Sequence, residues 1–376
     1  MAVPSDLEVE LMRRALALAR RAEGRTSPNP MVGAVVVRDG EIVGEGYHRR
    51  AGAPHAEVEA LAAAGERARG ARVYVTLEPC SHHGRTPPCA DALLQAGVAE
   101  VVYAVGDPNE LVSGRGHRRL EAAGVKVRAG LCADEARELN LPFFRHVTTG
   151  RPFVTAKFAM SLDGKIATRA GDSQWISGPE SLLRVHEMRD TSDAILVGAR
   201  TALTDDPRLT TRREGARDVR HPLRVVADST GRVPATARLY AAEPPPGATL
   251  ATTQAAPAVH REALSRQGVA VWTLPAAPDG RVSLSHLLDE LGRHEVLTLM
   301  VEGGGELLAA LLAEGLVDRL WAITAPLVIG GRGAPGPVGG PGVERLADAL
   351  RLRRLRVESV GDDLWMLFEP LAKPLP

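Results

Sequence analysis

The sequence predicts an α/β protein built from two domains. Its 376 residues exceed the usual span of a single domain. Extended apolar runs alternate with helical patterns along the whole chain, which is typical of α/β architecture. The segment Gly150-Arg151-Pro152 separates two groups of these elements. We therefore expect one domain over residues 1–147 and a second over residues 148–376.

The first domain is predicted to start with a helix and a hairpin. Ser5 and Glu8 form a capping box ahead of apolar residues at helical spacing. Two extended runs, 31–37 and 41–47, are joined by Asp39-Gly40, which is typical of a two-residue hairpin turn. Alternating elements follow, which indicates a three-layer α/β domain. We expect these as helices at 55–68, 89–96 and 115–123, and as strands at 72–77, 100–105 and 125–128.

The second domain repeats the alternation of strands and helices. Two segments lack it and are expected to be surface loops: 241–257, which holds three consecutive prolines, and the Gly/Pro-rich run 330–342. The expected strands are 153–160, 193–198, 222–228, 268–274 and 298–302. The expected helices are 180–190, 284–293 and 305–314.

Charge and cysteine content narrow the class of protein. The 46 Lys and Arg residues balance 46 Asp and Glu residues, so no long-range field attracts nucleic acid or an anionic membrane. No run approaches the ~18 apolar residues of a membrane span, and the N-terminus lacks the apolar core of a signal peptide. The three cysteines, Cys80, Cys89 and Cys132, are sparse and odd in number, which favours reduced thiols. These features predict a cytoplasmic protein without nucleic-acid or membrane partners.

A candidate zinc site combines one histidine with two cysteines. His55 stands at the start of a predicted helix, Cys80 follows a predicted buried strand, and Cys89 starts the next helix. One imidazole and two thiolates suit tetrahedral zinc and leave the fourth position for water. Zinc lowers the pKa of that water from ~15.7 towards ~7. Glu57 is placed to carry the water's proton to a ring nitrogen and a leaving amine. The pattern predicts a zinc-dependent deaminase.

Other interpretations of these residues remain open. The known deaminase signature is H-x-E…P-C-x-x-C, whereas eight residues separate the two cysteines here. His55 could simply cap a helix while the cysteines pack in a core. His82 or His83 could complete a closed structural zinc site, although a loop role is favoured for both. A nucleoside or RNA deaminase with an appended binding module is disfavoured by the long cysteine loop and the neutral charge.

The second half contains a candidate phosphate site. V-E-G-G-G-E-L-L (301–308) is a predicted strand, a glycine run and a helix start. Glycines let backbone N–H groups approach a phosphate at a helix N-terminus. The run does not match G-x-G-x-x-G, which argues against a Rossmann fold, and a simple tight turn is the alternative interpretation.

The cysteine segment P-C-S-H-H-G-R-T-P-P-C (79–89) resembles the deaminase domain of the bifunctional riboflavin-biosynthesis deaminase/reductase family. Similar blocks occur in order over nearly the whole chain, which makes the resemblance far more specific than any one block. They are T-S-P-N-P-M-V-G (26–33), G-Y-H-R-R-A-G-A-P-H-A-E (46–57), D-P-N-E-L-V-S-G-R-G (107–116), R-P-F-V-T-A-K-F-A-M-S-L-D-G-K-I-A (151–167), S-Q-W-I-S (173–177), D-D-P-R-L-T-T-R (205–212) and V-E-G-G-G-E-L (301–307).

The resemblance implies two successive reactions. A cytidine-deaminase-like N-terminal domain would deaminate 2,5-diamino-6-ribosylamino-4(3H)-pyrimidinone 5′-phosphate with Zn²⁺. A dihydrofolate-reductase-like C-terminal domain would reduce the ribosyl group of 5-amino-6-(5-phosphoribosylamino)uracil to ribityl with NADPH. We expect a homo-oligomer that acts on these phosphorylated pyrimidines.

The resemblance also implies roles for particular residues. In the first domain, zinc would be held by His55, Cys80 and Cys89, Glu57 would shuttle the proton, and pyrimidine or ribose-phosphate contacts would fall on Asn29, His48 and Arg85. Met31 and Arg85 depart from the family, which often has a polar residue and a lysine there. In the second domain, the substrate contacts would be Ser173, Arg189, Leu209, Arg212 and Glu302. The cofactor contacts would be Ala159, Trp175, Thr201, Asp205, Ser229, Gly304, Gly305, Glu306, Leu307, Leu308, Ala309 and Ala310.

Two chemical details of the reductase follow from the residue types. Arg189 and Arg212 are suited to anchor a phosphate, because a guanidinium grips phosphate oxygens at two points. Reduction also needs a proton at the opening sugar ring, and Lys157 and Asp163 are the nearby titratable candidates. The sequence does not choose between them.

Overall fold

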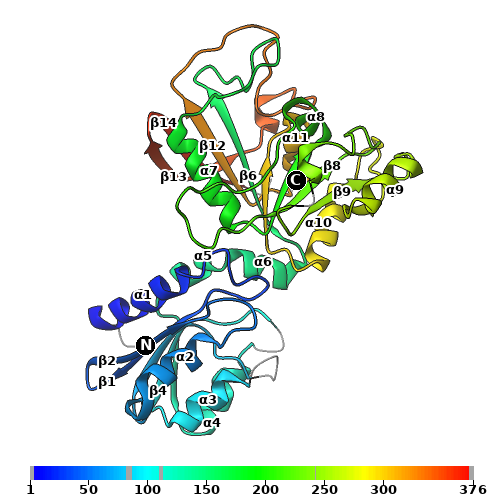
Figure 1. The fold of residues 1–376 in the computed structure, drawn as a ribbon. Coiled ribbons are helices and arrows are strands. Elements are labelled where there is room, and N and C mark those ends of the chain that lie inside the picture. The colour runs from blue at the N-terminus through cyan, green and yellow to red at the C-terminus, as the bar shows by residue number, and fades with distance from the viewer. Residues whose placement is uncertain (1–3, 82–86, 110–112, 242, 372–376) are drawn as a thin grey trace. The chain divides into compact units, whose positions relative to one another are not determined.

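The computed structural model describes residues 4–81, 87–109, 113–241 and 243–371. The chain divides into two compact units, Met1–Arg151 and Pro152–Pro376 (Figure 1). Each unit is built around one β-sheet with helices packed on it.

The first unit has a five-stranded sheet of order β2-β1-β3-β4-β5. β1 pairs antiparallel with β2 and β3, whereas β3, β4 and β5 run parallel. The strands are β1 Gly33–Arg38, β2 Glu41–Tyr47, β3 Arg72–Leu77, β4 Glu100–Val105 and β5 Lys126–Ala129. The helices are α1 Asp6–Arg20, α2 Ala56–Ala64, α3 Cys89–Ala96, α4 Arg115–Ala122, α5 Ala133–Leu139 and α6 Leu141–Thr149, with a 3₁₀ turn at Gly65–Ala68.

Two apolar cores cover the two faces of this sheet. One holds buried residues of α2, α3 and α4, such as Ala60, Leu93 and Leu120. The other holds buried residues of α1 and α5, such as Met12 and Ala136. The predicted three-layer arrangement is therefore confirmed. So are the capping box at Ser5 and Glu8 and the hairpin between β1 and β2.

Glycines in β2 allow α2 to lie close against the strand. A Cβ atom on Gly44 would lie 2.2 Å from the Ala60 carbonyl oxygen, and one on Gly46 would lie 2.5 Å from the Ala60 nitrogen. Neither position has room for a larger residue, so the two glycines set the position of the helix that His55 precedes.

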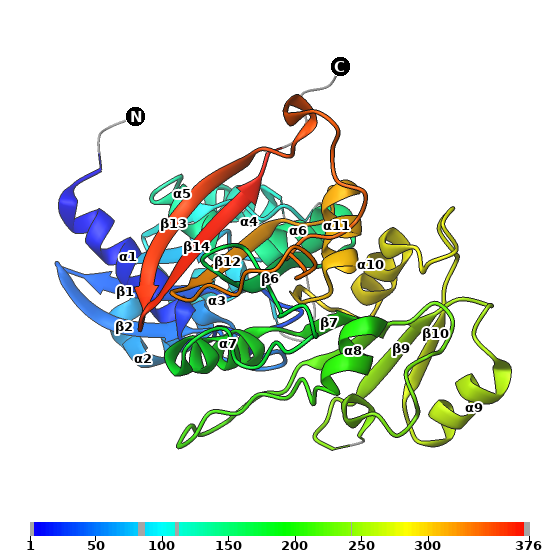
Figure 2. The same cartoon turned by 90° about the horizontal axis from the view of Figure 1, so that it is seen from above.

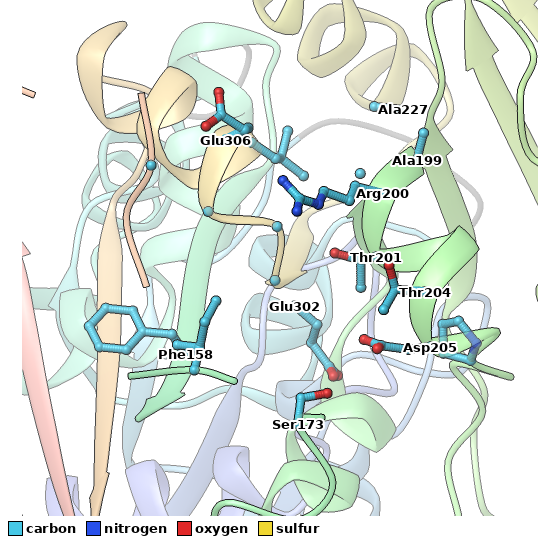
Figure 3. Close-up of a pocket in the computed structure, with 18 of the residues that line it drawn as sticks. Phe158, Ser173, Ala199, Arg200, Thr201, Thr204, Asp205, Ala227, Glu302 and Glu306 are labelled. Atoms are coloured by element: carbon cyan, nitrogen blue, oxygen red, sulfur yellow. The ribbon is translucent and has the colours of Figure 1, made fainter. Parts of the chain in front are cut away.

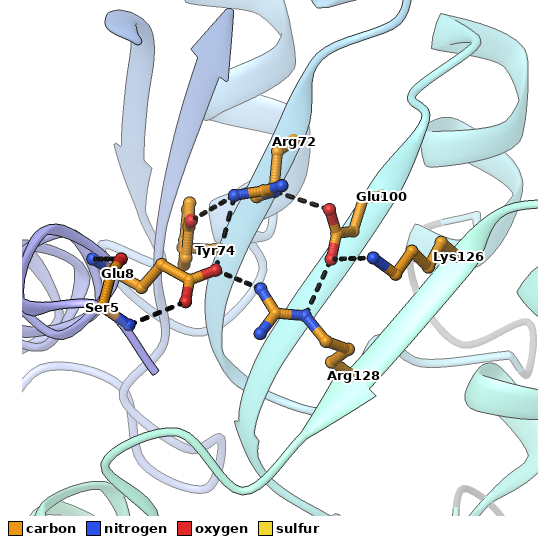
Figure 4. A network of polar contacts seen from close by, with 7 residues as sticks. All are labelled: Ser5, Glu8, Arg72, Tyr74, Glu100, Lys126 and Arg128. Atoms are coloured by element: carbon orange, nitrogen blue, oxygen red, sulfur yellow. Dashed lines mark hydrogen bonds and ion pairs between the residues drawn. The ribbon is translucent and has the colours of Figure 1, made fainter. Parts of the chain in front are cut away.

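A polar network ties the N-terminal ends of the parallel strands together (Figure 4). Arg72 begins β3 and bonds to Glu100 at the start of β4, with 2.6 Å between Nε and Oε2. Arg128 on β5 donates to Glu100 Oε1 at 2.8 Å and also contacts Glu8 on α1. Lys126 lies 3.6 Å from Glu100. The network therefore links α1 to three strands of the sheet.

The second unit has a nine-stranded sheet of order β10-β9-β8-β7-β11-β6-β12-β14-β13. Its strands are parallel from β10 to β12, and the hairpin β13–β14 adds antiparallel strands at one edge, opposite β9 and β10 (Figure 2). The strands are β6 Phe153–Ser161, β7 Ala194–Gly198, β8 Leu223–Ala227, β9 Ala248–Thr252, β10 Ala270–Thr273, β11 Thr298–Glu302, β12 Arg319–Ala325, β13 Leu352–Val360 and β14 Asp363–Pro370. The helices are α7 Pro179–Thr191, α8 Ala199–Asp205, α9 Ala258–Arg266, α10 Leu284–Arg293 and α11 Gly305–Ala313, with 3₁₀ turns at Arg238–Tyr240 and Leu346–Asp348.

The prediction of a surface loop at 241–257 is wrong. Residues 248–252 form β9, in which every residue is buried and which pairs with both β8 and β10. The prolines at 244–246 lie before the strand, so they do not interrupt its hydrogen bonds. By contrast, the run 330–342 contains neither helix nor strand, as expected.

Candidate active sites

The three predicted zinc ligands converge in the first unit. His55 immediately precedes α2, Cys89 is the first residue of α3, and Cys80 lies three residues beyond the end of β3. Their ligand atoms all lie within 4.8 Å of one another. His55 Nδ1 is 3.1 Å from Cys89 Sγ and 3.7 Å from Cys80 Sγ. The fold therefore brings Cys80 and Cys89 next to His55, although they lie 25 and 34 positions after it in the sequence.

The three donor atoms fit a tetrahedral zinc ion. With Zn–N and Zn–S bonds of usual length, neighbouring N and S atoms of a tetrahedral site lie about 3.6 Å apart, close to the separations here. A hydrogen bond from the Cys89 thiol lowers the pKa of Cys80 to about 4, and the His55 imidazole contributes in the same direction. The same hydrogen bond keeps the proton on Cys89 and raises the pKa of that thiol. A divalent cation at this point would favour the thiolate form of both sulfurs.

Glu57 lies buried beside these ligands. It is in the first turn of α2, two residues after His55, and its side chain is 3% exposed. Burial and the neighbouring Cys80 raise its pKa to about 7. A carboxyl group with a pKa near neutrality can both accept and donate a proton, which is what a proton shuttle requires.

Asn29 and His48 extend the site next to His55. The His48 ring packs edge-on against His55, with 5.4 Å between ring centroids. Its Nδ1 donates to the Pro54 carbonyl at 3.1 Å, so Nε2 accepts a hydrogen bond from Asn29 Nδ2 at 3.0 Å. Burial lowers the pKa of His48, which favours this neutral form. Arg85, like His82 and His83, lies outside the described residues.

The second unit contains a cavity of about 1450 Å³ (Figure 3). Its lining includes every residue predicted to contact the reductase substrate, namely Ser173, Arg189, Leu209, Arg212 and Glu302. It also includes the predicted cofactor residues, except Leu308 and Ala309. Leu308 is buried in the apolar core, and Ala309 lies beside Gly340. The helical period of α11 turns these two residues away from the cavity while Leu307 and Ala310 face it.

The glycine run forms one wall of the cavity. Gly303 and Gly304 have φ angles of 94° and 89°, and α11 begins at Gly305. A Cβ atom on Gly304 would lie 3.3 Å from Thr201 Oγ1, at the start of α8. The run therefore needs glycine for its backbone conformation, and it places the N-terminal ends of two helices along the same cavity. Such an arrangement suits the phosphates of a dinucleotide.

A buried ion pair lies at the C-terminal end of β11, directly before the glycine run. Arg189 Nε and Nη2 donate to the two Glu302 carboxylate oxygens at 2.6 and 2.7 Å, and Arg189 Nη1 donates to the Thr210 carbonyl at 3.1 Å. Burial raises the pKa of Glu302, but Arg189 and Lys157 outweigh it and lower the pKa to about 2. The Arg189 guanidinium is thus already bonded within the protein. Of the two predicted phosphate anchors, Arg212 is therefore the one that suits this role.

The structure separates the two candidate proton donors. Lys157 lines the cavity, and its Nζ lies 3.7 Å from Glu302 Oε2. Asp163 is not among the lining residues. It accepts hydrogen bonds from Ser161 Oγ and from the backbone N–H groups of Ile329 and Gly330, which lower its pKa to about 2. Asp163 therefore holds two loops together, and Lys157 is the candidate donor.

Several cavity residues were missed by sequence reasoning. They include His186, Arg200, Arg208 and Arg238. His186 lies one helical turn before Arg189 on α7, so the helix period was the one available signal for it. The Arg200 side chain points into the cavity (Figure 3). Arginine is so common in this chain that finding one at position 200 did not indicate a site.

The fold and the two sites define a two-domain enzyme, with a zinc-binding deaminase unit followed by a nucleotide-dependent reductase unit. Residues 5–105 match the family model for the cytidine and deoxycytidylate deaminase zinc-binding region, and residues 152–366 match that for the RibD C-terminal domain. The chain belongs to the RibD family of bifunctional riboflavin-biosynthesis deaminase/reductases.

Relatives resemble the chain over nearly its full length. Riboflavin biosynthesis protein RibD of Aquifex aeolicus is 43% identical over 97% of this chain and 99% of the relative. Riboflavin biosynthesis protein RibD of Escherichia coli is 45% identical over 94% of this chain and 96% of the relative. The solved structure of Acinetobacter baumannii RibD, form 1, has a TM-score of 0.89 at 38% identity and covers 97% of this chain and 99% of that one. The comparisons confirm the predicted fold class and the bifunctional enzyme.

A further solved structure carries both activities in its name. The Thermotoga maritima protein, described as a diaminohydroxyphosphoribosylaminopyrimidine deaminase/5-amino-6-(5-phosphoribosylamino)uracil reductase, has a TM-score of 0.85 at 33% identity. It matches 97% of this chain and 99% of its own. In the part of the chain that the structure describes, every helix is too short or too polar to cross a membrane.

Proposed function

We propose that residues 1–147 deaminate 2,5-diamino-6-ribosylamino-4(3H)-pyrimidinone 5′-phosphate, and that residues 148–376 then reduce the ribosyl group of the product with NADPH. The convergence of His55, Cys80 and Cys89 beside the buried carboxyl of Glu57 carries this proposal. The activities in the name of the Thermotoga maritima relative support the choice of substrates.

In the deaminase, His55, Cys80 and Cys89 hold the metal. Zinc, when bound, makes a water molecule acidic enough to lose a proton near neutral pH. Glu57 takes that proton to the pyrimidine nitrogen, and it then moves the second proton of the same water from the new hydroxyl group to the departing amine. A C–O bond forms and the C–N bond breaks, so water is consumed and ammonia is released. Asn29 and His48, which lie beside His55, contact the pyrimidine or its ribose phosphate, and Arg85 is assigned the same role.

In the reductase, the glycine run and the first turn of α11 bind the phosphates of the cofactor, which supplies a hydride when bound. Thr201, Asp205 and Ser229 line the same cavity. The remaining predicted contacts that line the cavity are Ala159, Trp175, the residues from Gly304 to Leu307, and Ala310.

The substrate is held across the ion-paired end of the cavity. Arg212 binds the phosphate, since a guanidinium matches its oxygens. The pair of Arg189 and Glu302 fixes the position of Lys157, and Lys157 delivers the proton to the opening sugar ring. Ser173 and Leu209 complete the substrate contacts.

We also propose that the protein is a cytoplasmic homo-oligomer whose partners are small phosphorylated pyrimidines, not nucleic acid or a membrane. The balanced charge and the sparse cysteines support this assignment. The edge strand β13 supports self-association, because it exposes Leu352, Leu355 and Val357 along an unpaired edge.

The experiment is a pair of assays on one purified chain. Ammonia release is measured with the diaminopyrimidinone phosphate, and oxidation of NADPH or NADH is measured with the deaminated product. The proposal expects both reactions, with NADPH as the hydride donor. Absence of either reaction from a folded, zinc-loaded chain would contradict it.

A further inference from the structure

His186 faces the reductase cavity from α7. It lies three residues before Arg189 on that helix, and both side chains line the cavity. His186 Nδ1 accepts a hydrogen bond from the backbone N–H of Arg212, at 3.2 Å. Because Nδ1 is the acceptor, the proton of the neutral ring must sit on Nε2. The backbone of the Arg212 segment thus selects one tautomer.

The surroundings of His186 disfavour a second proton on the ring. Burial lowers the pKa of His186 to about 4, and the positive charges of Arg189, Arg212 and Lys157 act in the same direction. The carboxylate of Glu302 acts in the opposite direction, but it already pairs with Arg189 and Lys157. His186 is therefore a neutral imidazole throughout the physiological pH range.

The neighbourhood of His186 is built for an anion. Arg208, Arg212 and Arg238 all line the cavity. Partial burial of its guanidinium lowers the pKa of Arg212, and the positive charges of Arg189, Arg208 and Arg238 act in the same direction. Within the described residues, none of the three guanidinium groups has an acidic partner within salt-bridge distance. A phosphate group would relieve this repulsion, and a neutral donor beside it can bond to the same ligand without adding further positive charge.

We propose that His186 is a substrate-binding residue of the reductase, whose neutral Nε2–H donates to an oxygen of the phosphorylated sugar while the Arg212 backbone holds the ring in this tautomer. This inference rests on the proposed reductase function and adds to it a residue that sets affinity for the phosphoribosyl group. A phosphate of NADPH offers the same chemistry, so the test must separate the two ligands.

Two substitutions distinguish the two ring nitrogens. In His186→Asn, the amide oxygen can still accept from the Arg212 N–H, but the distal donor is lost. In His186→Gln, the longer side chain returns an N–H near the position of Nε2. We expect His186→Asn to raise the KM for 5-amino-6-(5-phosphoribosylamino)uracil about tenfold, and His186→Gln to raise it no more than about threefold. The Kd of NADPH, measured by fluorescence, and ammonia release should both stay unchanged.

Three results would overturn this assignment. One is an unchanged substrate KM in His186→Asn. Another is an equal loss in both variants together with a lower melting temperature, which would mean that the residue is only structural. The third is a weakened NADPH Kd with a normal substrate KM, which would assign the contact to the cofactor. If the unaltered enzyme fails to reduce the uracil compound at all, it is the proposed function that fails.

A measurement on the unaltered enzyme tests the charge of the His186 ring directly. The Cε1–Hε1 NMR signal of His186 should stay constant between pH 8 and pH 5.5 and should shift when the phosphorylated substrate is added. The signal is assigned by its absence from the His186→Gln spectrum. The inference would be contradicted by a ring that titrates near pH 6.5, or by a signal whose chemical shift does not change when the substrate is added.

Discussion

Arg189 and Glu302 form a two-point ion pair inside the second unit, joining residues 113 positions apart in the chain at distances of 2.6 and 2.7 Å. Both side chains are almost fully buried, at 11% and 6% exposure. The pair joins α7 to the end of β11, directly before the glycine run. It therefore fixes the shape of the cavity at the point where Lys157 also meets Glu302.

Breaking this pair should destabilise the second unit strongly. Arg189→Leu leaves the Glu302 carboxylate buried without its main partner, which costs roughly 3–5 kcal/mol. Unfolding of the variant in urea measures the loss. Arg345→Leu is the control, because Arg345 and Asp348 also pair at two points, both at 2.9 Å, but on the surface. The control should change stability by less than about 1 kcal/mol. Equal effects in the two variants would show that burial of the pair is not what matters.

The polar network of the first unit should make its stability depend on acid pH. The hydrogen bond from Arg128 lowers the pKa of Glu8. Burial raises the pKa of Glu100, but Arg128 and Arg72 outweigh it and leave it lowered. A carboxylate with a depressed folded-state pKa contributes stability above its unfolded pKa, near 4.5, and loses it as the pH falls through the folded value.

Removing Arg128 should therefore flatten this dependence. Arg128→Met is expected to lower stability by roughly 1–2 kcal/mol at pH 7 and by less at pH 3, because the two carboxylates bind protons as the pH falls through their folded-state pKa values. Arg13→Met serves as control, since Arg13 pairs with Glu135 on the exposed surface. Urea unfolding at the two pH values checks the difference. A loss in Arg128→Met that is as large at pH 3 as at pH 7 would rule out the ion-pair explanation.

The zinc site predicts one metal ion per chain. Cys89→Ser replaces a thiolate with a hydroxyl that binds zinc poorly, so the metal should be lost together with ammonia release. Cys132→Ser is the matched control, because Cys132 stands before α5 and outside the group formed by His55, Cys80 and Cys89. Elemental analysis of the purified variants gives the result. Full zinc content in Cys89→Ser would remove that residue from the ligand set.

Arg212 should act on substrate binding in the reductase alone. Arg212→Ala removes a guanidinium that faces the cavity, and the loss of a charge-assisted hydrogen bond should raise the KM of the phosphorylated substrate roughly ten- to a hundredfold. Arg217→Ala, an exposed position on the same loop and outside the cavity lining, should leave it unchanged. Steady-state NADPH oxidation measures both. An unaltered KM in Arg212→Ala would exclude Arg212 from the site.

The zinc site could be predicted from sequence because residue identity determines it. One histidine, two cysteines and a glutamate at element ends define a donor set that few other arrangements offer. Their convergence needed only the expected order of strands and helices, and the fold supplied it. His48 and Asn29, by contrast, came from the family resemblance alone. Their bond to each other and their contact with His55 depend on how the loops around β1 and β2 fold.

The reductase site was harder to predict from the sequence, because the residues that contact one another there are far apart in the chain. Nothing in the local sequence shows that Arg189 bonds to Glu302 and not to a ligand, or that Asp163 holds a loop while Lys157 faces the cavity. Strand β9 was missed because its run of Ala, Thr and Leu is short and follows three prolines. Its burial comes from pairing with β8 and β10, which is a tertiary effect.

The central claim is that Glu57 and the three ligands beside it perform the deamination, independently of the reductase cavity. The most direct measurement compares Glu57→Gln with the unaltered enzyme, following ammonia from the diaminopyrimidinone phosphate and NADPH oxidation with the deaminated product. The glutamine is nearly isosteric but cannot carry the proton, so ammonia release should fall by roughly 10²- to 10⁴-fold while zinc content and reduction stay unchanged. Ammonia release at the normal rate in a folded Glu57→Gln chain would contradict the account.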